Sequence, residues 1–262
     1  MHLVIIVLVS LIASAIGAIA GIGGGVIIKP VLDSLGILEV ATISFLSGCT
    51  VLSMSAYNAL RSLSSGDKGL KKEIAFPLGI GAAVGGVAGK YLFSLISSLF
   101  ENTSRVGAVQ SACLIVITSL TFIYTLKPSF IRSHSVKNPF ASILAGLILG
   151  LISAFLGIGG GPINLMALSV LYSMNMKDAA KNSLMVIFLS QTASLLSTLI
   201  TNSVPDFSIL MLIMMVVCGI LGGIIGRMFN KKLSQKTVRI IFLCAMVVII
   251  LLSVKNLIYY LG

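Results

Sequence analysis

Long apolar runs dominate the sequence, and polar positions are confined to the short stretches between them. A helix needs about 20 apolar residues to cross the roughly 30 Å of hydrocarbon in a bilayer, at about 1.5 Å of rise per residue. Eight runs reach or approach that length: residues 3–20, 40–60, 74–97, 106–126, 140–156, 180–200, 207–227 and 238–258. The pattern predicts an all-α, polytopic membrane protein with eight full spans.

Two shorter apolar segments complete this pattern. Residues 24–36 and 160–173 each directly follow a cluster of glycines. Both segments are too short to form comfortable independent spans. We expect each to be a half-helix or the returning arm of a hairpin, and the sequence leaves open whether they cross the membrane or re-enter on one side.

The overall composition excludes a soluble globular protein. Hydrophobic residues make up 57% of the chain, charged residues make up 10%, and the mean hydropathy is +1.12. So few polar groups do not suffice to cover the surface of a soluble fold. The lipid bilayer is therefore an expected partner of this chain.

Basic residues are concentrated in alternate connections between the predicted spans. Fourteen of the 18 Lys and Arg residues lie within 61–73, 127–139, 177–181 and 227–239. The connections 98–105 and 201–206 hold only Arg105 between them. The positive-inside rule places the basic connections in the cytoplasm, with both chain termini outside. The net charge of +11 thus reflects orientation in a cell (inner) membrane, and we expect no nucleic-acid partner.

The sequence Gly-Ile-Gly-Gly-Gly occurs twice, at residues 21–25 and 157–161. The charge pattern places both ends of residues 1–38 outside and both ends of residues 140–177 inside. The two halves therefore share one layout in opposite orientations, which is characteristic of secondary transporters. We expect a first transmembrane repeat at 1–127, a basic cytoplasmic linker at 128–139 and a second, inverted repeat at 140–262.

Further matches support the repeat. The segment Gly-Gly-Val-Ala-Gly-Lys at 85–90 resembles Gly-Gly-Ile-Ile-Gly-Arg at 222–227. A second set of matches pairs Ser53 with Thr192 and Ser55 with Ser194. Small residues every three or four positions predict faces on which helices pack closely. We expect Lys90 and Arg227 to extend toward opposite membrane surfaces.

The two glycine clusters are the strongest candidates for a binding site. Non-helical backbone at membrane depth is tolerated only where it is buried in protein or lines an aqueous cavity. Glycine lets consecutive N–H groups converge, and a helix beginning at Gly25 or Gly161 adds the positive end of its dipole. Two such ends meeting near the midplane would form an anion site. The expected substrate-binding glycines are Gly21, Gly23, Gly24, Gly25, Gly157, Gly159, Gly160 and Gly161.

Polar side chains near the clusters extend the candidate substrate site. Lys29 follows the first cluster by one helical turn, and its ammonium either faces the cavity or reaches toward the outer surface. Asn164 is the polar residue near the second cluster. Thr50 and Gln191 lie near the middle of their spans, where a threonine commonly bonds its own helix backbone but a buried amide needs several partners. Asp33 is the candidate for coupling transport to a proton or Na⁺.

Signatures of enzymes and metal sites are missing from the sequence. Gly89-Lys90 lacks the upstream glycine and the following Ser or Thr of a phosphate-binding loop. His2 and His134 lie far from any cysteine, and the four cysteines are dispersed within apolar spans. We predict no enzymatic activity, no cofactor, no metal site and no disulfide.

Two Gly-x-Gly-Gly-Gly segments, each followed by a short apolar helix in inverted halves, resemble the TauE/SafE family of sulfite and organosulfonate permeases. Residues 21–30, which end in Pro30, look like the first signature of that family. Residues 157–166 look like the second, although Met166 stands where a proline often follows. Lys29 occupies a position that is usually apolar. The resemblance covers nearly the whole chain.

The resemblance implies a secondary transporter for a small sulfur-containing anion such as sulfite, sulfoacetate or another organosulfonate. The residues themselves also admit a different small oxyanion or a carboxylate as substrate. A channel-like pore and a non-transporting membrane protein are two further hypotheses. The direction of transport, the coupling ion and the oligomeric state do not follow from the sequence, and an oligomer is compatible with it.

Overall fold

The computed structural model describes residues 2–99, 103–127 and 136–261, and in this part of the chain every regular element is an α-helix. Part of the expected basic linker, residues 128–135, lies outside the described residues. The helices are α1 (His2–Ala20), α2 (Gly25–Leu35), α3 (Val40–Ser64), α4 (Lys72–Leu99), α5 (Thr103–Leu126), α6 (Pro139–Leu156), α7 (Gly161–Tyr172), α8 (Met176–Ile200), α9 (Ile209–Lys232) and α10 (Gln235–Leu261).

Eight of the described helices are long and apolar enough to cross a membrane, which confirms the eight predicted spans. The helices are nevertheless longer than the apolar runs. For example, α8 begins at Met176 rather than at residue 180, because the Asn175 side chain accepts a hydrogen bond from the N–H of Asp178 and caps a polar first turn. Hydropathy alone does not detect such polar helix ends.

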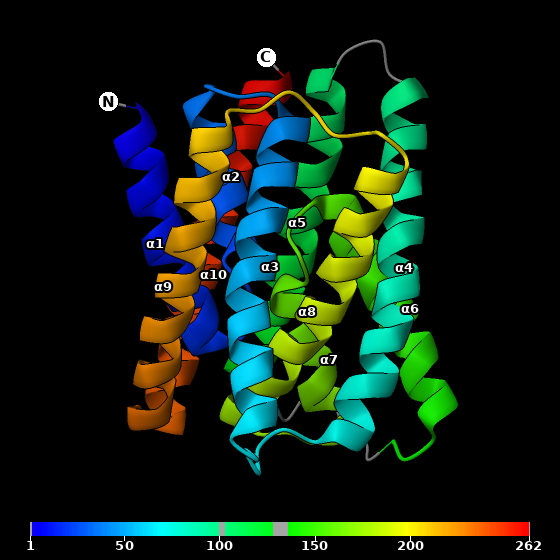
Figure 1. Ribbon diagram of the computed structural model, residues 1–262, viewed down its shortest axis with the longest axis vertical. Coiled ribbons are helices and arrows are strands. Elements are labelled where there is room, and N and C mark those ends of the chain that lie inside the picture. The colour runs from blue at the N-terminus through cyan, green and yellow to red at the C-terminus, as the bar shows by residue number, and fades with distance from the viewer. Residues whose placement is uncertain (1, 100–102, 128–135, 262) are drawn as a thin grey trace.

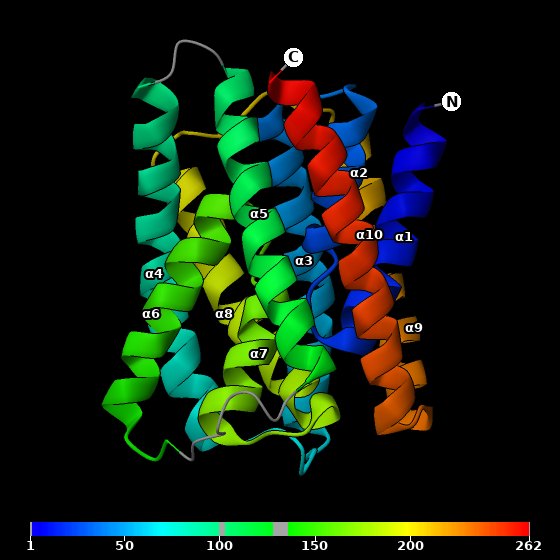
Figure 2. The same cartoon turned by 180° about the vertical axis from the view of Figure 1, so that it is seen from behind.

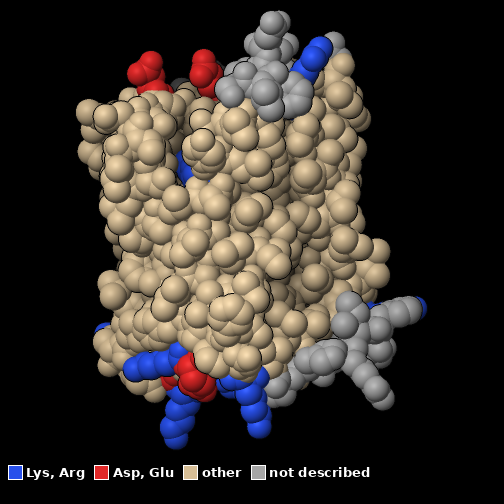
Figure 3. Space-filling model, turned by 90° about the vertical axis from the view of Figure 1, so that its right-hand side faces the viewer, with Lys and Arg blue, Asp and Glu red and all other residues tan. Residues whose placement is uncertain are grey.

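The two short helices are returning arms of hairpins (Figures 1 and 2). We name the end of the bundle at which α1 begins and α10 ends the terminal end, and the opposite end the basic end. The α1–α2 hairpin begins and ends at the terminal end, whereas the α6–α7 hairpin begins and ends at the basic end. Figure 3 shows Lys and Arg side chains gathered at the basic end, below a wide band in which few charged atoms reach the surface. This arrangement is consistent with the expected inverted repeat.

The helices of the two halves pack in equivalent ways. Helix α1 packs on α9 as α6 packs on α4, and α3 packs on α9 as α8 packs on α4. The short helices behave alike, since α2 contacts α10 and α7 contacts α5. Two pairs, α3 with α8 and α5 with α10, join a helix to its own counterpart.

Equivalent positions in the two halves lie 136 residues apart over most of this pattern. Helices α3 and α8 both have 25 residues, and their first residues, Val40 and Met176, are separated by the same interval as the two glycine clusters. The contacts of the glycine clusters fit this interval, because Gly21 lies against Ala180 of α8 and Gly157 lies against Ser44, the equivalent residue of α3.

The expected match of Ser53 and Ser55 with Thr192 and Ser194 is therefore wrong by three residues. Ser55 is equivalent to Gln191. The error arose because serine and threonine are common in both helices, so several registers give similar matches.

Glycines on α4 and α9 permit close helix contact. A Cβ atom added to Gly85 or Gly89 would overlap the backbone of α6 at the carbonyls of Leu147 and Leu151. On the other side of the bundle, Gly222 and Gly226 similarly face the backbone of α1. These positions therefore act in helix packing, as their spacing predicts.

Candidate functional site

The two glycine clusters meet inside the bundle. A Cβ atom on Gly25 would lie 2.8 Å from the carbonyl oxygen of Ile158, and one on Gly161 would lie 2.8 Å from a methyl group of Val26. Helix α2 begins at Gly25 and α7 begins at Gly161, so two helix N-termini lie at this junction. The positive ends of both helix dipoles are thereby brought to the interior of a membrane protein.

The backbone here carries unused hydrogen-bond donors. Among the described residues, the N–H groups of Gly23, Gly24 and Gly25 donate no hydrogen bond, and neither do those of residues 159–161. At Gly159 and Gly160 the φ angles are +74° and +127°, a conformation that L side chains rarely adopt. Buried amides normally have a partner, so this cluster is chemically suited to an anion or to ordered water.

A large cavity adjoins this junction. Its volume is about 510 Å³. It is lined by the first half of α3, the second halves of α4 and α8, and the connection between α8 and α9, which all lie at the terminal end (Figure 1). Gly157 and Gln191 also line it. We call this cavity the vestibule.

Lys90 is the charged side chain among the described residues that line the vestibule. It is partly buried, and it forms no hydrogen bond or ion pair with any described residue. Lys90 was expected to extend toward a membrane surface, but it lines the vestibule. Hydropathy did not reveal this because the side on which a helix meets a cavity depends on its neighbours.

The remaining predicted residues are distributed around the junction. Gly159 lies against the Gln191 amide, and Gly23 lies between Val51 and Ile187. Thr50 is fully buried and donates its hydroxyl to the Leu46 carbonyl at 2.8 Å, so it is used within α3 and does not line the vestibule.

Of the 12 predicted substrate-binding residues, Gly157 and Gln191 line the vestibule, and the other ten, all described, lie outside its lining. Gly21 packs on α8 and Gly24 packs on Ser14 of α1. Asn164 is 2% exposed, lies against Gly160, and its side-chain oxygen has no partner among the described residues. Asn164 is therefore available to a ligand only if the ligand reaches the glycine junction itself.

Lys29 and Asp33 form a buried ion pair, with 3.2 Å between the ammonium and a carboxylate oxygen. Lys29 extends neither to the outer surface nor into the vestibule, and its Cδ atom lies close behind Gly157. A cavity of about 10 Å³ adjoins the pair, and Gln110 lines both this cavity and the vestibule.

Several buried acceptors around this small cavity are unused. They are Asp33 Oδ1, Gln110 Oε1, Ser253 Oγ and Asn256 Oδ1, which have no hydrogen-bond partner among the described residues. The volume is comparable to that of one water probe. A water molecule or a small cation would satisfy these acceptors.

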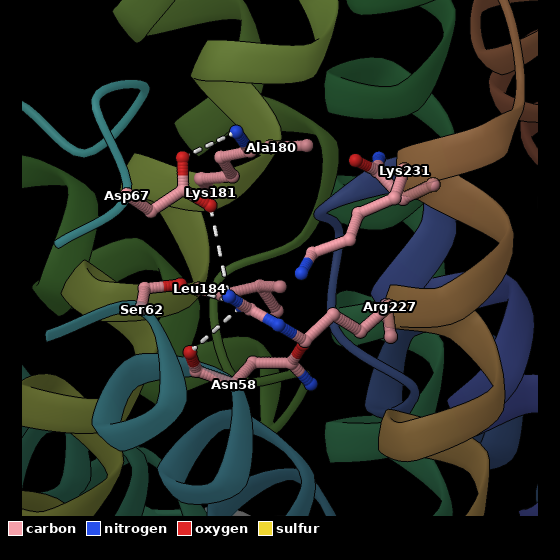
Figure 4. A pocket seen from close by; sticks show the side chains of 10 residues that line it. Asn58, Ser62, Asp67, Ala180, Lys181, Leu184, Arg227 and Lys231 are labelled. Atoms are coloured by element: carbon pink, nitrogen blue, oxygen red, sulfur yellow. Dashed lines mark hydrogen bonds and ion pairs between the residues drawn. The ribbon is translucent and has the colours of Figure 1, made fainter. Parts of the chain in front are cut away.

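At the basic end a second cavity has a volume of only about 20 Å³, and we call it the closed cavity because a substrate does not fit in it (Figure 4). Asp67 pairs there with Lys181 at 2.7 Å and with Arg227 at 3.6 Å. Arg227 also donates hydrogen bonds to the hydroxyl of Ser62 at 2.6 Å and to the carbonyl of Asn58 at 3.3 Å. These contacts join the ends of α3, α8 and α9.

The electrostatic environment of Asp67 keeps its carboxylate charged for these ion pairs. Burial raises the pKa of its carboxyl, but the hydrogen bonds from Lys181 and the Gly69 N–H, together with the charges of Lys181 and Arg227, outweigh burial. The net result is a pKa below the ordinary value for aspartate. Asp67 therefore stays ionised, and the ion pairs persist, at neutral pH.

The closed cavity is the counterpart of the vestibule. Each of the 10 residues that line the closed cavity has an equivalent 136 or 137 residues away that lines the vestibule. Examples are Asn58 with Ser194, Ala18 with Ala154, and Arg227 with Lys90. One architectural position is thus open at the terminal end and closed at the basic end.

Comparison with known proteins identifies the family of this chain. The family model described as sulfite exporter TauE/SafE matches residues 6–253. The chain belongs to the TauE/SafE family. It is also similar to the probable membrane transporter protein YunE of Bacillus subtilis (strain 168), with 26% identity over 225 residues that cover 78% of this chain and 81% of that protein. No solved structure matches.

Family membership and the eight apolar helices together show that this TauE/SafE protein is a multi-pass membrane transporter. The family is a transporter class rather than an enzyme class. Both predicted signature segments lie within the matched range, at the junction of the two hairpins. Lys90 and Asp67 were not predicted as site residues. The signal for Lys90 was the match between the Gly-Lys and Gly-Arg segments, and the signal for Asp67 was its place as an acidic residue within a basic connection.

Proposed function

We propose that this protein is a secondary transporter that carries a small sulfur-containing anion, such as sulfite, sulfoacetate or another organosulfonate, across the cell membrane by alternating access. The observation that carries this proposal is the vestibule, which is bordered by Gly157 and Gln191 beside the glycine junction and is lined by Lys90, a lysine with no ion-pair partner among the described residues. The sulfur chemistry is supported by the description of the matching family as sulfite exporter. A different small oxyanion or a carboxylate is the alternative substrate.

The chemistry of the junction fits an oxyanion with several oxygens. The amides of both clusters supply several N–H donors, and the helix N-termini of α2 and α7 add positive potential without titratable groups. Gln191 borders both Gly159 and the vestibule and supplies an amide side chain. An anion at Gly157 would also lie close to Lys29, behind that glycine. A site of this kind suits a sulfite or sulfonate group, and the volume of the vestibule leaves room for an organic substituent.

Alternating access is supported by the pair of equivalent cavities. In an inverted repeat, exchanging the conformations of the two halves opens the closed cavity and closes the open one. The vestibule and the cavity at Asp67 are related in this way. The same pair of cavities disfavours a channel-like pore, because the cavity at the basic end is closed by ion pairs in this conformation.

We propose that the basic end faces the cytoplasm, since Lys and Arg gather there and the positive-inside rule applies to short connections. Both termini then face outward. The vestibule in this conformation is open to the outside, and the cavity at Asp67 is its cytoplasmic counterpart.

The Lys29–Asp33 pair is our candidate for coupling. It is buried immediately behind Gln110, which borders the vestibule. An anion that draws the Lys29 ammonium away from Asp33 would leave that carboxylate without its cation, and Asp33 would then take up a proton or Na⁺. This sequence of events couples one cation to each anion.

The experiment is anion binding and flux with purified protein. Thermal unfolding is measured with sulfite, sulfoacetate, taurine, thiosulfate, sulfate, phosphate and small carboxylates at matched ionic strength. A ligand at about 100 times its dissociation constant stabilises the folded state by roughly 2.7 kcal/mol. Selective stabilisation by sulfite or a sulfonate, with saturable counterflow in liposomes, is expected. Stabilisation by a carboxylate alone would overturn the substrate class, and unitary conductance without saturation would overturn the carrier mechanism.

A further inference from the structure

Lys90 and Arg227 occupy equivalent positions, 137 residues apart, at the ends of the matched glycine segments on α4 and α9. Each lines the cavity at its own end of the bundle. Their environments differ, because Arg227 is paired with Asp67 whereas Lys90 has no ion-pair partner among the described residues. One cation is therefore held in a closed cavity while the other is available in an open one.

We propose that Lys90 and Arg227 are equivalent anion-recruiting residues that the transporter uses one at a time, and that Asp67 determines which of the two is available. This inference rests on the proposed function, namely alternating access for an anion. In the present conformation Lys90 faces the vestibule and attracts the substrate. In the opposite conformation the basic end opens, and Arg227 leaves Asp67 and attracts the substrate there.

The charges around the closed cavity support the second half of this proposal. Lys181, Arg227 and Lys231 line it together with a single acidic residue, Asp67 (Figure 4). Asp67 is shared between Lys181 and Arg227 through its two carboxylate oxygens. When the helices separate, one carboxylate cannot remain paired with both cations. At least one cation then faces the opened cavity and favours entry of an anion.

The vestibule lacks an equivalent ionic closure. The position equivalent to Asp67 is Ser203, and the position equivalent to Lys181 is Phe45. If the vestibule closed in the same geometry, Lys90 would meet the Thr198 hydroxyl, which is the equivalent of Ser62, and no carboxylate. A partly buried ammonium with only neutral partners is less stable than the charge-paired Arg227. The asymmetry therefore favours the conformation in which the vestibule is open.

The test measures the conformation without any anion. The four native cysteines are replaced by alanine, and single reporter cysteines are introduced as Ser197→Cys in the vestibule or Leu184→Cys in the closed cavity. The rate of labelling by a neutral maleimide is measured in detergent-purified protein. Asp67→Asn is expected to raise labelling of the Leu184→Cys reporter and to lower labelling of the Ser197→Cys reporter, and the ratio of the two labelling rates should change by about tenfold if roughly 1.4 kcal/mol of ionic closure is lost.

A second variant supplies the missing carboxylate. Ser203→Asp supplies a carboxylate for Lys90 and should close the vestibule. Each reporter should then change in the same direction as in Asp67→Asn, with faster labelling of Leu184→Cys and slower labelling of Ser197→Cys. Adding Lys90→Gln should abolish that effect. Matched controls are Glu73→Gln at the basic end and Asp206→Asn at the terminal end, because both residues are exposed and their carboxylates form no ion pair among the described residues. If Asp67→Asn and Ser203→Asp change labelling no more than these controls, the inference is overturned.

Recruitment of the anion is tested by sulfite binding in the same variants. Lys90→Gln should weaken binding of sulfite to the parent protein but have little effect in the Asp67→Asn background, where Arg227 has taken over. Equal weakening in both backgrounds would refute the alternation of the two cations. If the labelling rates change as expected but sulfite binds to no variant, the ionic closure stands and the proposed substrate fails. If sulfite binds normally and labelling is unchanged, the proposed function stands and this inference fails.

Discussion

Replacement of Gly159 by alanine separates the backbone strain of the glycine junction from its role in anion binding. Gly159 has a φ angle of +74°, and alanine in this left-handed region costs about 1–2 kcal/mol. A Cβ atom would also overlap the side-chain amide nitrogen of Gln191 and would lie 2.9 Å from a methyl group of Val51. Gln191 must therefore move away from the junction, and the N–H groups beside it are no longer in the same arrangement.

Two other glycines provide matched controls. Gly66 has a φ angle of +60°, and nothing lies within 4 Å of an added Cβ atom, so Gly66→Ala tests backbone strain alone. Gly23 has a φ angle of +76°, and an added Cβ atom would lie 3.5 Å from Ile187 and Val51, which is ordinary contact. Gly23→Ala therefore tests strain within the junction without displacement of Gln191.

The expected order follows from these contacts. All three variants should lose about 1–2 kcal/mol of stability from strain, and Gly159→Ala should lose about 1–3 kcal/mol more from the contact with Gln191 and Val51. The assay is thermal unfolding with and without saturating sulfite. Gly66→Ala should keep the full shift produced by sulfite, whereas Gly159→Ala should lose most of it. If Gly159→Ala folds and binds sulfite as tightly as Gly66→Ala does, the junction is not the anion site.

Three further outcomes are expected. The pKa of Asp67 is depressed in the folded state, so its contribution to stability is present above the ordinary aspartate pKa and is lost as pH falls through the depressed value. In Asp67→Asn the loss of stability with falling pH, measured between about pH 6 and pH 2, should therefore be less steep. An unchanged steepness would contradict the ion pairing. Replacing Lys29 alone by Met should destabilise the protein by about 3–5 kcal/mol by leaving Asp33 as an unpaired buried charge, whereas Lys29→Met with Asp33→Leu should recover much of that loss in thermal unfolding. Thr50→Val should leave sulfite affinity nearly unchanged, since the Thr50 hydroxyl is bonded within α3. Gln191→Ala should weaken sulfite affinity by about tenfold, because Gln191 lines the vestibule. A binding titration in which Thr50→Val weakens affinity more than Gln191→Ala would show that Thr50, and not Gln191, contacts the anion.

The spans and the glycine positions could be derived from the sequence because they depend on local properties. Insertion of a helix into a bilayer requires a continuous apolar segment, and that requirement is written in consecutive residues. The clusters that begin at Gly21 and Gly157 could be recognised for the same reason, since glycine-rich backbone stands out against an apolar helix. The predicted orientation rests on the counts of basic residues in short connections and stays a prediction.

Contacts between distant segments could not be derived in this way. The three-residue error in matching Ser55 arose because residue types in α3 and α8 support several registers, and only the packing of both helices on the glycine clusters selects one. Lys90 has the sequence context of a surface residue, but α8 and α3 leave a cavity beside it. The pairing of Asp67 with Arg227 joins residues 160 positions apart, at the meeting of three helix ends.

The sequence by itself therefore determined the class of protein, the number of spans and the position of the polar backbone, because lipid imposes these requirements on each segment separately. Only the tertiary structure decided which of two equivalent cavities is wide and which of the cations Lys90 and Arg227 is ion-paired among the described residues. That choice depends on a small difference in free energy between two packings of the same helices, and it is made by contacts such as those of Asp67 with Lys181 and Arg227, which exist only after the helices have assembled.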